Sequence, residues 1–206
     1  MNEEYLVFTG RPNAGKSSII REVMGIHVTT GKHPGTTRSI SKYALSRNLF
    51  LVDMPGYGRM TGVSKQLENM RKNRIIRFLE SNAQNIALAV HVLDISTFLE
   101  VTWRMEKKGL ISLDVEMVQY LTKTLGEIPL VTANKIDKTR KDEIAANLEE
   151  LKNRISEGQP PVAKDYVFPV SARTGKGLDT LKNAIRARLA EKGMHARRLE
   201  VSGNDF

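Results

Sequence analysis

Residues 10–17, GRPNAGKS, combine glycines, a lysine and a serine at a spacing that suits phosphate binding. The pattern G-x-x-x-x-G-K-[ST] lies between a strand-like and a helix-like segment, the context in which it is informative. Its glycines let backbone N–H groups point at one phosphate, and the helix N-terminus adds positive partial charge there. Lys16 suits the β- and γ-phosphates, and the Ser17 hydroxyl suits Mg²⁺. We predict nucleotide binding by Gly10, Arg11, Pro12, Asn13, Ala14, Gly15, Lys16, Ser17 and Ser18.

Two further segments offer oxygen ligands to the same phosphates. DMPG at 53–56 closes a second strand, so Asp53 can hold Mg²⁺ through a water and the Gly56 N–H can donate to the γ-phosphate. Alone, this tetrapeptide is also ordinary turn chemistry. HPGTTR at 33–38 carries two hydroxyls, and a loop ordered by metal and γ-phosphate would act as a switch; the alternative is a solvated turn. The candidate binding residues here are Gly35, Thr36, Thr37, Asp53, Met54, Pro55 and Gly56.

Two later segments indicate which base the nucleotide carries. NKID at 134–137 ends a buried strand, where ligands bind in open parallel sheets. The Asp137 carboxylate can accept hydrogen bonds from the guanine N1–H and 2-amino group, and adenine lacks these donors; an Asx turn is the structural alternative. SAR at 171–173 follows the last strand, where backbone N–H groups can meet the guanine O6. The candidate base-binding residues are Asn134, Lys135, Ile136, Asp137, Ser171, Ala172 and Arg173.

The elements that must position these residues follow an alternating strand and helix pattern, which predicts an α/β fold. We expect a three-layer P-loop NTPase fold with a mostly parallel sheet flanked by helices, as one domain over residues 1–190 with a flexible basic tail over 191–206. Leu67, Met70, Ile75 and Leu79 have the spacing of an amphipathic helix with a basic outer face. The expected strands are Tyr5–Thr9, Leu49–Asp53, Ile86–Leu93, Pro129–Ala133 and Tyr166–Val170, and the expected helices are Lys16–Met24, Lys65–Leu79, Leu113–Leu125, Asp142–Ser156 and Leu178–Ala190.

Composition excludes several function classes. The chain has 206 residues and no cysteine, which excludes disulfides, cysteine-ligated metals and thiol catalysis. It has no apolar run of 18 residues, so we expect no membrane span and a cytoplasmic protein. Its net charge of +9 is concentrated in residues 59–80 and 182–198. Two such segments favour a polyanionic partner, although solvated helix faces are the alternative.

Taken together, GRPNAGKS, PGTTR, DMPGYG, NKID and SAR resemble the translation-factor-like small GTPases over about residues 4–190. The set looks most like the EngB (YihA/YsxC-like) family, whose members are GTPases implicated in large ribosomal subunit assembly. The resemblance implies that Thr37 and Ser17 are the Mg²⁺ ligands, and that ribosomal RNA or the large subunit is the partner of a monomeric protein. Arg173 departs from the lysine that many GTPases carry. Era-like and EngA-like GTPases share the motifs but usually carry a further domain.

The chain lacks the glutamine that usually positions the attacking water, because Tyr57 follows DMPG. We therefore expect slow hydrolysis of GTP to GDP, with Lys16, Thr37 and Asn13 as the catalytic candidates. Related GTPases with asparagine at the matching place are activated by K⁺, so the resemblance implies the same role for Asn13; the alternatives are an asparagine that caps the loop and an arginine from a partner. Two other functions stay open: an RNA-binding protein that uses nucleotide only as a latch, and an Era-like GTPase with a different RNA partner.

Overall fold

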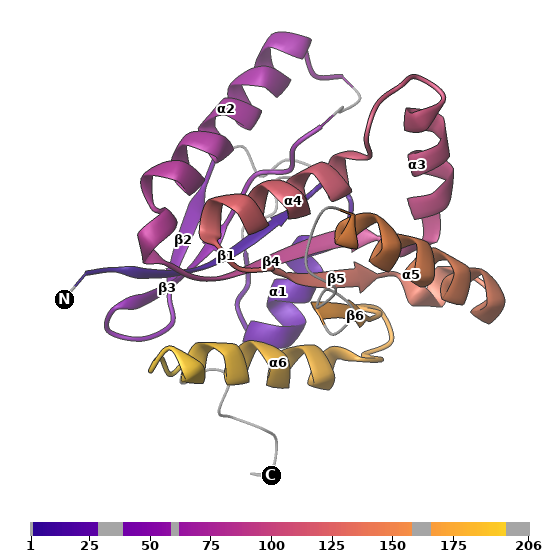
Figure 1. Cartoon of the computed structure of the whole chain (residues 1–206). Coiled ribbons are helices and arrows are strands. Elements are labelled where there is room, and N and C mark those ends of the chain that lie inside the picture. Colours follow the sequence, from indigo (N-terminus) through magenta and orange to yellow (C-terminus); the bar gives the residue numbers. More distant parts are fainter. Residues whose placement is uncertain (1, 29–38, 59–61, 158–165, 197–206) are drawn as a thin grey trace.

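A central six-stranded sheet organises the part of the chain that this computed structural model describes, residues 2–28, 39–58, 62–157 and 166–196 (Figure 1). Its strand order is β2-β3-β1-β4-β5-β6, and every neighbouring pair is parallel except the edge pair β2 and β3. The predicted α/β class with a mostly parallel sheet is confirmed. The strands are β1 (Glu4–Gly10), β2 (Ser41–Ala44), β3 (Leu49–Asp53), β4 (Ile86–Asp94), β5 (Leu130–Asn134) and β6 (Val167–Pro169).

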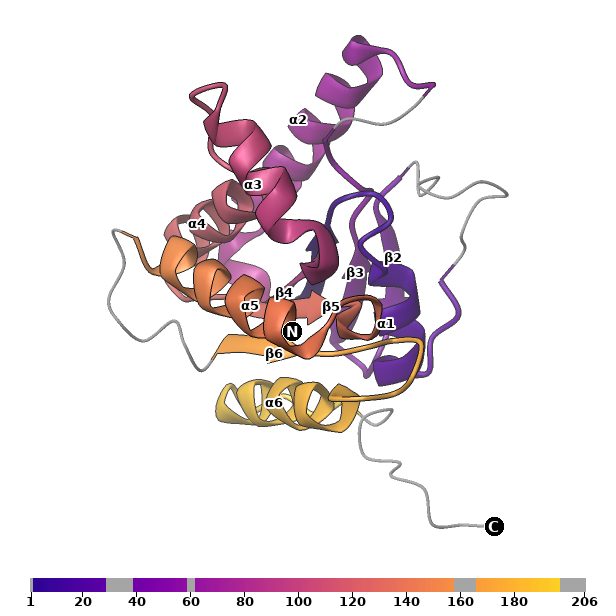
Figure 2. The same ribbon diagram turned by 90° about the vertical axis from the view of Figure 1, so that its right-hand side faces the viewer.

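Helices cover both faces of the sheet, which gives the predicted three layers (Figures 1 and 2). On one face, α1 and α6 share an apolar cluster with the strands, and on the other face α2, α3, α4 and α5 form two further clusters. Short 3-10 turns η1 (Ala83–Asn85), η2 (Ile95–Thr97) and η3 (Ile136–Lys138) adjoin β4 and β5. The helices are α1 (Lys16–Met24), α2 (Lys65–Ser81), α3 (Phe98–Glu106), α4 (Leu113–Leu125), α5 (Lys141–Ser156) and α6 (Leu178–Glu191).

The strands at the centre of the sheet are buried on both faces. Along β1, Leu6 and Phe8 pack toward α1 and α6, whereas Val7 packs toward α2 and α4, and none of the three is exposed. Side chains alternate between the faces of a strand, so a strand covered by helices on both sides is apolar at nearly every position. The nine-residue β4, IALAVHVLD, follows the same rule. A rigid central sheet therefore fixes the positions of the loops at its carboxyl edge.

Helix α2 forms as predicted, but its buried stripe differs from the prediction. Leu67 and Met70 are 41% and 56% exposed, and the side chains that face the core are Arg71, Ile75 and Leu79. These three are spaced four residues apart, so they form one face of the helix. The prediction that Leu67 and Met70 face inward is therefore wrong.

Two elements were not predicted. The edge strand β2 (Ser41–Ala44) alternates half-buried and exposed residues and pairs antiparallel with β3. Helix α3 (Phe98–Glu106) buries Phe98 and Thr102 and leaves Trp103 56% exposed. The other predicted boundaries match the observed ones or differ from them by one or two residues. No helix in the described ranges is long and apolar enough to span a membrane.

The C-terminal end of the described chain packs partly against the core. Beyond the end of α6, Ala196 is 4% exposed and belongs to the apolar cluster beneath the sheet, with Met194 packed against it. The flexible basic tail over 191–206 stays a prediction. Residues 197–206 lie outside the described ranges.

Candidate functional site

The phosphate loop, residues 10–17, connects β1 to α1 at the carboxyl edge of the sheet. Gly15 is the N-cap of α1 at φ 94°, and a Cβ at this position would lie 2.2 Å from Asn134 Nδ2. Backbone conformation and space therefore both require glycine. The first N–H groups of a helix have no partner within the helix, so those of α1 are available to an anion.

Lys16 and Asp53 form a buried ion pair behind this loop. Lys16 Nζ contacts Asp53 Oδ1, and the residues are 7% and 1% exposed. Burial lowers the pKa of Lys16 and raises that of Asp53, because each charged form loses hydration, and the opposite charge of the partner offsets part of both shifts.

The same region contains oxygen atoms that suit a divalent cation. Asp53 Oδ2 is buried and has no hydrogen-bond partner among the described residues. Ser17 lies next to Lys16 in the first turn of α1. Carboxylate and hydroxyl oxygens are the ligands that Mg²⁺ prefers, and a buried anionic oxygen without a donor favours a cation nearby. The residues present therefore fit Mg²⁺.

The DMPG turn lies directly against the phosphate loop. Met54 N–H donates to Phe8 O at 3.1 Å, which continues the pairing of β3 with β1. A Cβ on Gly56 would meet Pro12 N and Cγ at 3.0 Å, so the two loops approach as closely as their backbones allow. Glycine at this position keeps the turn against the loop.

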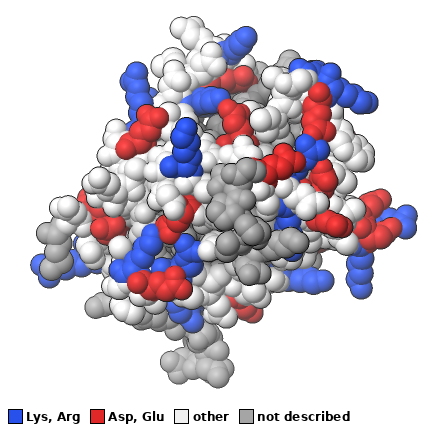
Figure 3. Space-filling view, viewed as in Figure 1, with Lys and Arg blue, Asp and Glu red and all other residues white. Residues whose placement is uncertain are grey.

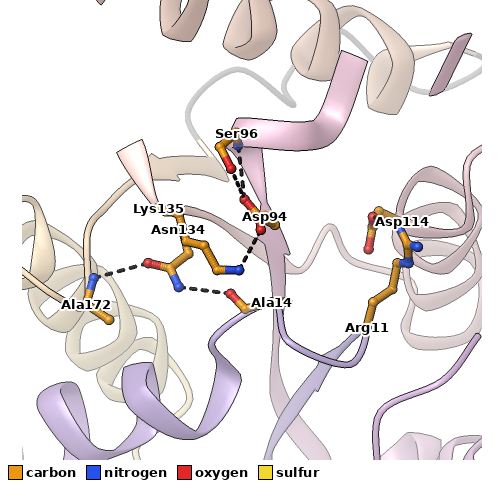
Figure 4. Close-up of polar contacts among 8 residues, drawn as sticks. All are labelled: Arg11, Ala14, Asp94, Ser96, Asp114, Asn134, Lys135 and Ala172. Atoms are coloured by element: carbon orange, nitrogen blue, oxygen red, sulfur yellow. Dashed lines mark hydrogen bonds and ion pairs between the residues drawn. The ribbon is translucent and has the colours of Figure 1, made fainter. Parts of the chain in front are cut away.

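Asn134 joins the phosphate loop to the last loop of the site (Figure 4). Its Nδ2 donates to Ala14 O at 2.9 Å, and its Oδ1 accepts from Ala172 N–H at 3.1 Å. The residue is 2% exposed. The side-chain amide is therefore occupied in holding two loops together, which residue spacing alone did not reveal.

Lys135 is anchored by an acidic residue that the sequence reasoning missed. Its Nζ donates to Asp94 Oδ2 at 2.5 Å, and Asp94 Oδ1 accepts from the N–H and Oγ of Ser96 (Figure 4). Lys135 has φ 71°, a left-handed conformation that a lysine rarely adopts. The Asp94 contact lies across neighbouring strands, and a D-x-S sequence after a buried strand was the available signal.

The Asp137 carboxylate faces the loop after β6. Oδ1 accepts from Ser171 Oγ at 2.5 Å and Oδ2 accepts from Arg173 Nε at 2.6 Å. These donors hold the pKa of Asp137 below its ordinary value, Ser171 most and Arg173 next. Asp137 is thus an ionised acceptor at the edge where we predicted the base to bind.

A buried polar network lies behind the phosphate loop, and sequence reasoning did not predict it. His91 Nδ1 shares a hydrogen bond with Thr9 Oγ1 at 2.9 Å, and its Nε2 is 3.3 Å from Asp114 Oδ1. Asp114 Oδ2 lies 3.5 Å from Arg11 Nη1, which links α4 to the loop (Figure 4). The Tyr57 ring centroid is 6.3 Å from that of His91, and burial raises the Tyr57 pKa well above its ordinary value. Tyr57 therefore points into the core.

The switch-loop candidates Gly35, Thr36 and Thr37 lie outside the described residues. Asn13 is exposed at the tip of the phosphate loop with φ 64°, and its side chain makes no hydrogen bond to any described residue. Asparagine tolerates this left-handed conformation better than most residues. Within the described part of the chain, its amide caps no backbone group.

The predicted basic surfaces are only partly present. Along the predicted basic outer face of α2, Arg71 is 8% exposed and packs inward, while Lys72, Arg74 and Arg77 are exposed. In the C-terminal basic segment, Arg188 and Lys192 both bind Glu127. On the face drawn in Figure 3, acidic side chains lie among the basic ones. The outward basic side chains are therefore fewer than the sequence suggests.

Comparison with known proteins identifies relatives over most of the chain. Residues 5–135 match the family described as "50S ribosome-binding GTPase". A probable GTP-binding protein EngB from Methanopyrus kandleri is 38% identical over 91% of this chain and 93% of its own, and one from Pyrococcus horikoshii is 39% identical over 87% and 81%. A crystal structure of a probable GTP-binding protein EngB, 35% identical, superposes with a TM-score of 0.80 over 91% of this chain and 99% of that one.

Proposed function

The chain belongs to the EngB family of GTP-binding proteins, and from this we propose that it binds GTP and hydrolyses it slowly as a switch that assists assembly of the large ribosomal subunit. The observation that carries the proposal is that Asn134 hydrogen-bonds to the phosphate loop and to the loop after β6, so that three loops meet at one sheet edge. A phosphate-binding loop and a base-binding loop tied together in this way can hold both ends of one nucleotide.

In this proposal the phosphates lie on the loop of residues 10–17 and the guanine lies against Asp137. Asp137 accepts from the guanine N1–H and 2-amino groups, and the Ala172 N–H, Lys135 and Arg173 lie beside the base. The support is the ionised carboxylate of Asp137 at this edge and the fixed loop around Ser171, which is itself fully buried. Adenine offers no matching donor pair, so discrimination rests on this carboxylate.

In this proposal Mg²⁺ is held by Ser17 and Thr37 and, through a water, by Asp53. When bound, the ion supplies positive charge to the β- and γ-phosphate oxygens. Asp53 would help to hold the ion through a water, and the Lys16 ammonium, now paired with Asp53, would stabilise the charge of the transferred phosphoryl group.

Hydrolysis is attack of water on the γ-phosphorus, and the chain's own residues make it slow. Tyr57, in the place of the usual glutamine, is 3% exposed and faces His91, so it does not orient a water. We propose that K⁺ supplies the positive charge that hydrolysis needs beside the phosphates. Asn13 would hold this ion, because its exposed amide has no partner among the described residues. An arginine from a partner is the alternative, and comparison of GTP turnover in K⁺ and in Na⁺ distinguishes the two.

The partner in this proposal is ribosomal RNA of the large subunit. The exposed cations of α2, which follows the DMPG turn, support it, as does the description of the matching family. Contacts to phosphates release counterions, so binding weakens steeply as salt rises.

Co-sedimentation with purified large ribosomal subunits tests the partner. We expect pelleting with a non-hydrolysable GTP analogue and little with GDP, and a several-fold loss for the double variant Arg74→Ala, Arg77→Ala. The double variant Arg47→Ala, Lys141→Ala removes two exposed cations elsewhere and should bind like wild type. Equal pelleting with GDP and the analogue contradicts the switch and favours the latch.

A further inference from the structure

Arg173 occupies the acceptor that the proposed function assigns to guanine. Its Nε donates to Asp137 Oδ2 at 2.6 Å, and the Asp137 side chain is 9% exposed. Ser171 already donates to the other oxygen, Oδ1, at 2.5 Å. Both carboxylate oxygens therefore have a donor from the protein itself.

Guanine and an arginine side chain present the same kind of donor group to a carboxylate. The N1–H, C2 and 2-amino group of guanine form a guanidine unit that presents two parallel N–H donors. An arginine side chain ends in the same unit, which matches carboxylate geometry in the same way. A lysine at this place would offer a point charge without that planar pair of donors. The Arg173 side chain thus resembles the edge of the base that Asp137 would recognise.

The two protein donors differ in how firmly they are held. Ser171 is fully buried, and its Oγ also accepts from Thr174 N–H at 3.1 Å. Its neighbour Ala172 is fixed by the hydrogen bond to Asn134. The Arg173 side chain is 72% exposed and has no other partner among the described residues. Ser171 therefore stays in place, and Arg173 is the donor that can leave.

We infer that Arg173 is an internal competitor of the guanine base for Asp137, which lowers nucleotide affinity and slows association. This inference rests on the proposed function. Guanine binding then requires Arg173 to release Oδ2, and departure of the base lets Arg173 take that oxygen again. Arg173 is in this sense a residue that sets affinity and exchange.

The test measures association rate and Kd of a fluorescent GDP analogue. We expect Arg173→Ala to bind about 1.5- to fivefold more tightly, the range that exposed ion pairs span, mainly through faster association. Arg173→Lys should fall between wild type and the alanine variant. Lys176→Ala is the matched control, because it removes an exposed cation from the same loop without a contact to Asp137, and it should leave both values unchanged.

A double-mutant cycle links the effect to the shared carboxylate. In an Asp137→Ala background there is no carboxylate for Arg173 and guanine to compete for, so adding Arg173→Ala should change Kd by less than about 1.5-fold. An unchanged Kd for Arg173→Ala alone overturns the inference. Weaker binding overturns it too, because Arg173 then serves the base. Wild-type protein that binds ATP as well as GTP instead overturns the proposed function, so the two failures are distinguishable.

Discussion

Replacement of Asn134 by alanine should damage stability and nucleotide binding together. The variant leaves the Ala14 carbonyl and the Ala172 N–H without their partner, and Ala14 is 2% exposed. Each lost hydrogen bond costs about 1 kcal/mol, and a buried group left unpaired costs about 1–3 kcal/mol. We therefore expect the free energy of unfolding to fall by about 2–4 kcal/mol.

The assay is urea unfolding followed by GDP titration well below the unfolding transition. With an m-value of about 2 kcal/mol per M, the urea midpoint should drop by about 1–2 M. GDP binding should weaken at least tenfold, because both loops lose the contact that fixes them relative to each other.

Asn147→Ala is the matched control. Asn147 is 5% exposed and donates to Ile95 O at 2.9 Å, so this variant also removes a buried amide hydrogen bond. It should lose stability yet bind GDP normally. If Asn134→Ala binds GDP as tightly as Asn147→Ala does, the reasoning that Asn134 aligns the two loops is refuted.

Three further predictions concern Asp137 and Asn13. Asp137→Asn should weaken GTP binding at least tenfold and shift preference toward xanthosine nucleotides, measured by competition titration; retained guanine preference would contradict the base assignment. Hydrogen bonds hold the pKa of Asp137 below its ordinary value of 3.8, so its carboxylate supports GDP binding above that value and loses this contribution as pH falls through the folded-state pKa. GDP affinity should therefore keep the Asp137 contribution at about pH 5. A loss of GDP affinity at that pH that disappears in Asp137→Asn would contradict this prediction. GTP turnover should be faster in K⁺ than in Na⁺ at equal ionic strength and lose this difference in Asn13→Ala, whereas equal rates in both salts would remove K⁺ from the mechanism.

Local sequence patterns predicted where the loops that carry the candidate site lie in the fold. GRPNAGKS lies between a strand and a helix, and the loop conformation at Gly15 follows from its residue types. Carboxyl ends of parallel strands meet at one edge, so motif order alone placed NKID and SAR near the phosphate loop. Asn134 and Asp137 lie at that edge as a result.

Side-chain partners across strands could not be predicted in this way. Asp114 is separated from Arg11 by 103 residues, and nothing in either local sequence indicates their contact. Arg71 shows the related error within a helix. We assumed that a charged residue faces solvent, although its spacing from Ile75 and Leu79 places it on the buried face.

The central claim is that this site selects guanine nucleotides, and competition against a fluorescent GDP analogue tests it most directly. Unlabelled GDP and GTP should displace the analogue at similar concentrations, whereas ATP and GMP should require at least a hundredfold more, because ATP lacks the donors for Asp137 and GMP lacks the outer phosphates for Lys16. Displacement by ATP at the same concentration as GTP would contradict the account.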